Sequence, residues 1–253
     1  MGEKSLRADE KIRVFFVFAC TAWLFFGCGD SNLFEGLGDD GTQQAKFEAA
    51  KMAVDQKDYT SAIDILVGLC GTIPDAPTCD SPTVSLLASA YMGRAGVDML
   101  QLIKDAETAG SWPCTYTLFS KLFQHSLTQL SSDQSDLLKS LALLNSLPSR
   151  TSEEGFQLAI GGISELVVEL GLISSGYNSA GKPINPPSSP AGVPAGTVTQ
   201  VSLDLGYIQT GLTESGLSAQ SIGSTLNQVL TNFGTVTSNS LFVFLQALNA
   251  TSC

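Results

Sequence analysis

The chain has 253 residues, enough for one large or two small domains, and 43% of them are hydrophobic, which supplies apolar surface for a sizeable core. Thirteen basic residues against 24 acidic ones give a net charge of −11. Phosphate groups and anionic lipid headgroups are bound by clusters of Lys and Arg, and no such cluster follows the N-terminal segment. The composition therefore argues against nucleic-acid binding and against docking of a folded body on anionic lipid.

The N-terminal segment contains a fifteen-residue apolar run, VFFVFACTAWLFFGC from Val14 to Cys28, after a basic start. This layout is typical of a secretory signal, and the run is shorter than the about 20 residues that a membrane-spanning helix needs. The residues Phe25-Phe26-Gly27-Cys28 resemble the lipobox of bacterial lipoproteins, in which cleavage precedes a cysteine that then carries lipid. Gly27 and Cys28 fit the family, whereas Phe25 and Phe26 stand where it prefers Leu and a small residue.

The resemblance implies a signal peptide over residues 1–27, a lipidated Cys28 and a location in the bacterial cell envelope. An uncleaved signal anchor and ordinary secretory cleavage are the alternatives. Gly29 and Asp30 do not form the Asp-first sorting signal of enteric lipoproteins, so we expect the outer membrane. Residues 28–41, with Gly and Asp, are predicted to be a tether, and residues 42–253 a single all-helical domain.

Helical periodicity begins with predicted helices over Gln43 to Lys57 and Ser61 to Leu69. These residues resemble a tetratricopeptide repeat (TPR), a helix-turn-helix unit of 34 residues. The residues at the family's spacing are Ala49, Ala50, Ala53, Asp58, Tyr59, Ala62, Leu66 and Pro74. Lys46 departs from the pattern, because the family prefers an aromatic residue there.

A second, weaker unit is predicted to open at Ser81-Pro82, with Ser81 as N-cap, and to turn at Ala95-Gly96. The TPR-like part then covers residues 42–105. Generic helical hairpins are the alternative to true repeats. In either case the prediction is an all-α fold of stacked helical hairpins, as a TPR-like α-solenoid or an irregular helical bundle.

The middle of the chain is predicted to contain helices over Thr115 to Leu130 and Ser135 to Leu147, and a third that opens with the capping box Thr151-Ser152-Glu153-Glu154. In this third helix the pair Gly161-Gly162 costs about 1 kcal/mol per glycine relative to alanine. The pair therefore indicates either close helix packing or a bend.

Residues 174–196 contain five of the ten prolines and are predicted to form one long loop or linker. Helices are predicted after it over Val198 to Thr210, Ser218 to Phe233 and Ser238 to Asn249, with Gly234 as a C-terminal cap. Gly161 to Gly176 aligns without gaps on Gly196 to Gly211. This similarity suggests two equivalent helices, capped by Gly176 and Gly211 and crossing closely at Gly171 and Gly206, unless it arises by chance in a Gly- and Leu-rich chain.

Four cysteines follow Cys28, and four permit three disulfide connectivities. Cys70 and Cys79 flank a short Pro-containing connection, so we favour that pair and, by elimination, Cys114 with Cys253. Free buried thiols are the alternative.

Catalytic groups are scarce. The lone histidine, His125, is predicted to lie in a helix without a flanking carboxylate, and with no Cys-x-x-Cys a zinc site has almost no ligands available. Paired carboxylates could serve a hydrolase, and the candidates are Glu153 with Glu154, Glu165 with Glu169, and Asp133 with Asp136. Helix faces and caps explain each pair more simply. We therefore predict no catalytic residue, no metal and no cofactor.

Four aromatic side chains are candidates for binding a partner, because partner surfaces favour aromatic anchors: Trp112, Tyr116, Tyr177 and Tyr207. The sequence thus predicts a lipid-anchored envelope protein that acts as a non-catalytic interaction scaffold for an unidentified protein or peptide. A carrier of a small apolar ligand or lipid is the first alternative. A hydrolase that uses paired carboxylates is the second.

Overall fold

The computed structural model describes residues 42–70, 79–98, 120, 123, 125–216, 227, 230, 231 and 233–250. Over these residues the chain forms seven α-helices, a 3-10 turn and no strand, with one isolated β-bridge between Tyr177 and Pro183. The all-α prediction is confirmed. The chain divides after Ala45, and Lys46–Cys253 forms a compact unit.

Helices α2 (Gln43–Asp55) and α3 (Tyr59–Cys70) form the first hairpin. The Asp58 side chain accepts a hydrogen bond from the Ser61 backbone N–H (3.2 Å) and so caps the start of α3. Ala50 of α2 and Ala62, Ile63 and Leu66 of α3 are buried in one apolar cluster. Of the small residues predicted for this hairpin, Ala50 and Ala62 lie at its core, Ala53 is partly buried and Ala49 is exposed.

Helix α4 (Ser81–Arg94) begins at Asp80, which is the N-cap in place of the predicted Ser81. The Asp80 carboxylate accepts hydrogen bonds from the Thr83 backbone N–H (3.1 Å) and hydroxyl (2.5 Å). Both Thr83 donors bond to the same oxygen of Asp80, Oδ1. The predicted turn at Ala95-Gly96 is confirmed, since Ala95 ends the helix.

Helix α7 (Leu127–Ser146) corrects two predictions. The Ser126 hydroxyl caps its start by accepting from the Gln129 N–H (3.3 Å), so His125 lies before the helix and not inside one that ends at Leu130. The break predicted between Leu130 and Ser135 does not occur. The residues there continue the helix, with Ser131 and Ser132 on its exposed face.

Helix α8 (Ser152–Ile173) opens with the predicted capping box, in which Thr151 and Glu154 bond to each other's backbone N–H groups. Gly176 adopts a left-handed conformation (φ 94°) and bonds to the Gly171 carbonyl, which ends the helix as predicted. Of the described helices, α8 alone is long and apolar enough to cross a membrane, with a mean hydropathy of 1.6 and 72% of that stretch buried. Soluble core helices share this property, so it is weak evidence of a span.

The Pro-rich segment is a loop, as predicted, and it packs against the body. It includes the turn η1 (Pro190–Gly192) and leads into α9 (Ala195–Ser215). The side chain of Gln246, in helix α11 (Ser238–Ala250), donates to the Pro187 carbonyl (2.9 Å). The predicted cap at Gly234 is confirmed, because its N–H bonds to the Leu230 carbonyl (3.2 Å).

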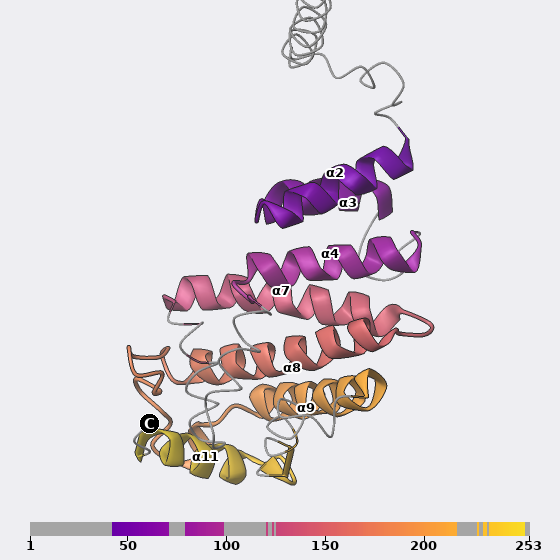
Figure 1. Ribbon diagram of the computed structural model, residues 1–253. Helices are drawn as coiled ribbons and strands as arrows, with labels where there is room; N and C mark the ends of the chain where they lie inside the picture. The colour runs from indigo at the N-terminus through magenta and orange to yellow at the C-terminus, as the bar shows by residue number, and fades with distance from the viewer. Residues whose placement is uncertain are drawn as a thin grey trace, which may run out of the picture. The chain divides into compact units, whose positions relative to one another are not determined.

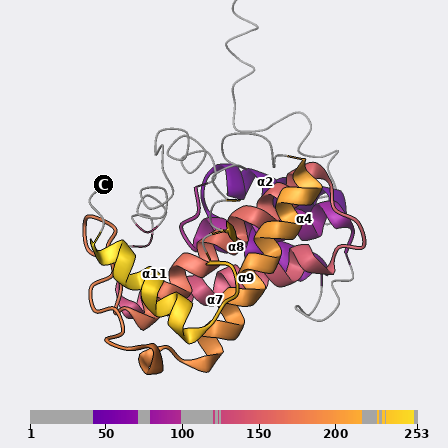
Figure 2. The ribbon, with the colours of Figure 1, turned by 90° about the horizontal axis from the view of Figure 1, so that it is seen from below.

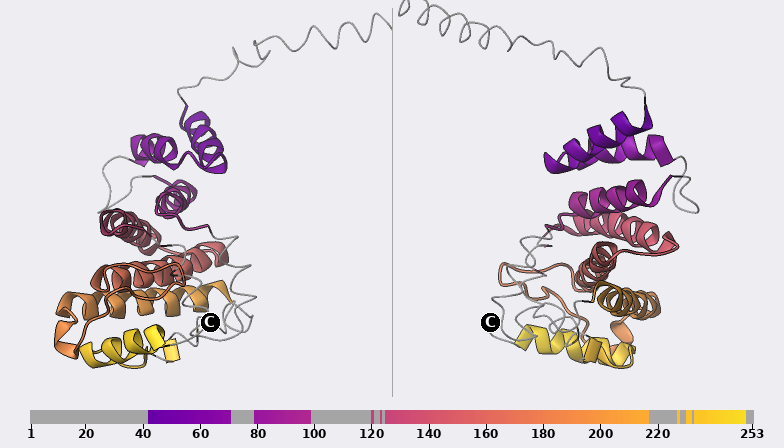
Figure 3. Two further views of the ribbon diagram at one scale, coloured as in Figure 1. Left: turned by 90° about the vertical axis from the view of Figure 1, so that its left-hand side faces the viewer. Right: turned by 45° about the vertical axis from the view of Figure 1, so that its right-hand side comes forward.

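The described helices pack in chain order: α3 on α4, α4 on α7, α7 on α8 and α8 on α9. Figure 1 shows these helices as successive layers, and Figure 3 shows α8 and α9 side by side. Helix α11 contacts α9 and η1, as Figure 2 shows from below. This order is typical of stacked helical hairpins, in which each element mainly contacts its neighbours.

Candidate functional site

Helices α8 and α9 approach closely because glycines lie between them. A Cβ atom on Gly162 would lie 2.9 Å from the Asp204 carbonyl oxygen, and one on Gly155 would lie 2.9 Å from the Ser215 backbone nitrogen. Gly211 lies against the Gly155 and Ala159 backbone. The close packing predicted for Gly161-Gly162 is therefore confirmed, with Gly161 against Leu141 of α7.

The proposed equivalence of α8 and α9 is wrong. Gly211 lies inside α9, which ends at Ser215 with Gly216 as its left-handed C-cap. Gly206 has no atom within 4 Å of a Cβ, and the atoms nearest to a Cβ on Gly171 belong to the Tyr177 ring and to Leu130 of α7, not to α9. The aligned residues therefore occupy different structural positions.

A cluster of buried acidic and amide side chains lies where α7, α8 and α9 meet, and we call it the acid cluster: Glu165 and Glu169 of α8, Asp204 and Gln200 of α9, and Gln134 of α7. The Gln134 amide donates to Glu165 (3.2 Å) and to Glu169 (2.5 Å). The Gln200 amide donates to Asp204 (2.9 Å). Glu165 and Asp204 have no exposed surface, and Glu169 is 9% exposed.

The two fully buried carboxyl groups of the acid cluster interact directly. Glu165 and Asp204 influence each other's pKa and are therefore neighbours. Glu165 Oε2 and Asp204 Oδ2 are buried and accept no hydrogen bond from a described N–H or hydroxyl group. Burial is the main cause that raises the pKa of each carboxyl group; the charge of Glu169 raises both further, and the Gln134 and Gln200 amides oppose the shift. Both shifts favour the protonated form of the pair.

The predicted pair Asp133 and Asp136 is divided between two structural interactions. Arg94 of α4 donates two hydrogen bonds to Asp136, both 2.7 Å long, and the Lys139 ammonium lies 3.6 Å from the same carboxylate. Arg94 also stacks over the Tyr91 ring at 5.3 Å. The hydrogen bonds from Arg94 to Asp136 raise the pKa of the Arg94 guanidinium. This ion pair joins α4 to α7.

Asp133 bonds to His125, for which the sequence analysis predicted no neighbouring carboxylate. The distance from His125 Nδ1 to Asp133 Oδ2 is 2.7 Å, and the Gln129 amide donates to the other oxygen (2.9 Å). The Ser120 hydroxyl donates a hydrogen bond to the Gly181 carbonyl of the Pro-rich loop (2.6 Å). The histidine and aspartate therefore fix the segment before α7.

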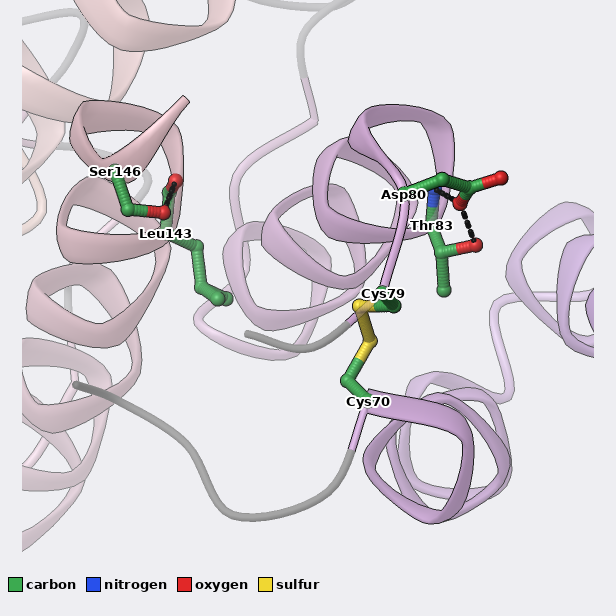
Figure 4. The surroundings of a disulfide bond; sticks show 6 residues. All are labelled: Cys70, Cys79, Asp80, Thr83, Leu143 and Ser146. Carbon is green, nitrogen blue, oxygen red and sulfur yellow. Dashed lines mark hydrogen bonds between the residues drawn. A yellow bond between two sulfur atoms is a disulfide. The ribbon is translucent and has the colours of Figure 1, made fainter. Parts of the chain in front are cut away.

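The disulfide predicted between Cys70 and Cys79 is present, with a Cα–Cα distance of 4.7 Å. Figure 4 shows it joining the end of α3 to the residue that precedes the Asp80 cap of α4. The bond therefore fixes the register between these two helices. The predicted pair of Cys114 and Cys253 lies outside the described residues.

The aromatic candidates are not exposed anchors where they are described. Tyr177 is buried at 5% exposure, and its hydroxyl donates to the Val167 carbonyl (2.6 Å), which corrects the prediction that it binds a partner. Tyr207 is half-buried against the apolar cluster of the N-terminal helices. Burial raises the pKa of Tyr207, and the nearby Asp204 and Glu165 charges raise it further. Trp112, Tyr116 and the lipidation candidate Cys28 lie outside the described residues.

Sequence reasoning selected Glu165 and Glu169 but missed Asp204, Gln134 and Gln200. A signal for Asp204 exists, because it falls on the apolar face of α9 beside Val201, Leu205 and Ile208. A carboxylate on such a face needs a buried partner. Nothing in a single sequence tells which helix supplies that partner.

Within the described ranges, no three His, Cys, Asp or Glu side chains are grouped so that they could hold a metal ion. No protein-family model, no curated protein and no solved structure matches the chain. The residues themselves are therefore the basis for assigning a function.

Proposed function

We propose that the protein is a lipid-anchored component of the bacterial cell envelope whose helical body binds another protein or peptide and catalyses no reaction. The packing of the described helices in chain order carries the proposal. Helical hairpins stacked in this way present a long surface that suits an extended peptide. The TPR-like residues Ala50, Ala62 and Leu66, buried in the first hairpin, support the same function.

The environment of the carboxylates favours a scaffold over a hydrolase. A hydrolase that uses two carboxyl groups must place both against its substrate. Asp136 is held by Arg94, Asp133 by His125, and Glu165 has no surface that solvent can reach. These groups support the fold and present no described face to a substrate.

The packing of α8 on α9 also favours a scaffold over a carrier of an apolar ligand. The Gly155, Gly162 and Gly211 positions leave no room for even one added methyl group between these helices. A carrier would need open volume in such a place. Native mass measurement of the purified full-length protein is expected to give the mass of the chain and its lipid anchor, and an additional bound lipid would favour the carrier instead.

The anchor is proposed to be a lipid on Cys28 at the outer membrane, and Cys28→Ser tests it. A serine cannot accept the thioether-linked lipid, so the variant should keep its signal segment and change its electrophoretic mobility. Processing is read from the electrophoretic mobility and membrane association by fractionation, with Cys20→Ser as the matched control. If Cys28→Ser is processed and retained as the unaltered protein is, lipidation of Cys28 is wrong.

Partner binding is tested by crosslinking the protein in its native envelope and identifying the captured chains by mass spectrometry. The proposal predicts that the same protein partner is recovered in repeated preparations. Recovery of lipid without a protein partner would contradict it.

A further inference from the structure

We propose that Glu165 and Asp204 form one proton-binding site that holds α8 against α9 while it is protonated and loosens this helix pair when the proton leaves. The site is independent of the proposed scaffold function, because it depends only on contacts inside the body. It makes the packing of two core helices sensitive to pH.

Burial and the lack of hydrogen-bond donors favour a proton on one of the two carboxyl groups. Both have no exposed surface, and they lie on different helices whose backbones are brought close by Gly162. Glu165 Oε2 and Asp204 Oδ2 are buried and have no hydrogen-bond partner among the described residues. Two ionised carboxylates cannot bond to each other, whereas a proton on one of them supplies the donor that these oxygens lack.

The groups that face the site from each neighbouring helix do not neutralise a second charge. Helix α7 supplies the Gln134 amide, α8 adds the Glu169 carboxylate, and α9 adds the Gln200 amide and, through its charge interactions, Tyr207. Helix α11, which packs on α9, contains no titratable residue. On α4, Arg94 bonds to Asp136.

Loss of the proton therefore leaves two buried negative charges beside the partly buried Glu169, without a described cation in contact. Charges of like sign in a low-dielectric interior repel strongly, and each also loses its hydration. The repulsion and the loss of hydration both act at the contact between α8 and α9. These two helices separate more readily once the site is ionised.

The sign of the pH dependence follows from the direction of the pKa shifts. Both groups have a pKa raised in the folded state, so in the pH range above the usual carboxyl values the folded chain holds a proton that the unfolded chain has lost. Stability from this site is complete below the unfolded pKa of about 3.9 for Asp and is lost as the pH rises through the folded value. One such proton raises the unfolding equilibrium constant by up to about tenfold per pH unit.

The test is denaturant unfolding of the full-length protein over a pH series, with Asp204→Asn and Glu165→Gln. Each amide can donate a hydrogen bond without titrating, so both variants should reduce the pH-dependent part of the unfolding constant. Hydrogen exchange should show faster opening of α8 and α9 at high pH in the unaltered protein, and a weaker response in the variants. The matched control is Glu153→Gln, which removes an exposed carboxylate from α8 and should keep the full pH dependence.

Direct spectroscopic detection of the protonated carboxyl group tests the proposal even if a variant fails to fold. Infrared spectroscopy of the unaltered protein at neutral pH should show the carbonyl band of a protonated carboxylic acid, and the band should disappear at alkaline pH. The absence of this band at neutral pH overturns the proposal. So does an unchanged pH dependence in both folded variants.

Discussion

Some buried charged side chains of the described helices have a partner on a neighbouring element, which makes them costly to change. Asp136 illustrates the point, because its side chain is 7% exposed while the Arg94 side chain that binds it is 34% exposed. Removing one partner of such a pair leaves the other charge buried and uncompensated. The arginine thus contributes mainly by supplying hydrogen-bond donors to the buried Asp136 carboxylate.

Substitution of Arg94 by Met tests this role. Lys139 remains 3.6 Å from Asp136 and part of Arg94 was already in water, so the expected loss is about 2 kcal/mol in the free energy of unfolding. Lys57→Met is the matched control, since the Lys57–Asp98 pair is exposed on both sides and its loss should cost less than about 0.5 kcal/mol. Equal losses in urea unfolding of the two variants would show that Arg94 is only a surface charge.

At the scale of the helices, contacts within a few residues were predictable from the sequence and contacts between helices were not. The capping box at Thr151 and Glu154 and the turn at Ala95-Gly96 depend on local bonds, and both were predicted correctly. The start of α7 was missed, because Leu122, Phe123 and Leu127 continue a helical apolar period through Ser126, which instead caps a new helix. The Ser126 cap, and not the apolar periodicity, sets the start of α7.

Gly206 and Gly211 of α9 differ in their surroundings and therefore provide a matched pair of substitutions. Ala at Gly211 would press its Cβ against the backbone of Gly155 and Ala159, whereas Ala at Gly206 would meet open space on the same helix. Gly211→Ala is therefore expected to lose about 1–3 kcal/mol through forced separation of α8 and α9.

Gly206→Ala is expected to gain about 0.5–1 kcal/mol, because alanine is the better helix former. Thermal or urea unfolding of both variants measures the difference. If both substitutions stabilise the protein, the close approach of α8 and α9 at Gly211 is wrong.

At the scale of the whole molecule, the sequence predicted the class of fold and the loop within it. Apolar periodicity is enough to predict helices, and five prolines in residues 174–196 are enough to predict a long loop. The acid cluster could not be predicted, because Glu165, Asp204 and Gln134 come from three helices and meet only through the way these helices stack. Apolar periodicity in a single sequence does not show which elements distant in sequence pack together.

The stacking in chain order also bears on how a partner would be bound. The exposed apolar side chains Met52 of α2, Leu203 of α9 and Val243 of α11 are 60%, 50% and 55% exposed and lie on separate helices. Single exposed apolar residues are ordinary on a protein surface. As positions for probes, however, they report contacts along the length of the described chain without disturbing its core.

The most direct test of the scaffold proposal places a photo-crosslinking residue at Met52, Leu203 or Val243 of the full-length protein and irradiates intact cells. The irradiated protein without a probe is the control. We expect a protein-sized adduct, with the same partner identified by mass spectrometry, from at least one of the three positions. Adducts with lipid alone at all three positions, or none at any of them, would contradict a body that binds a protein or peptide.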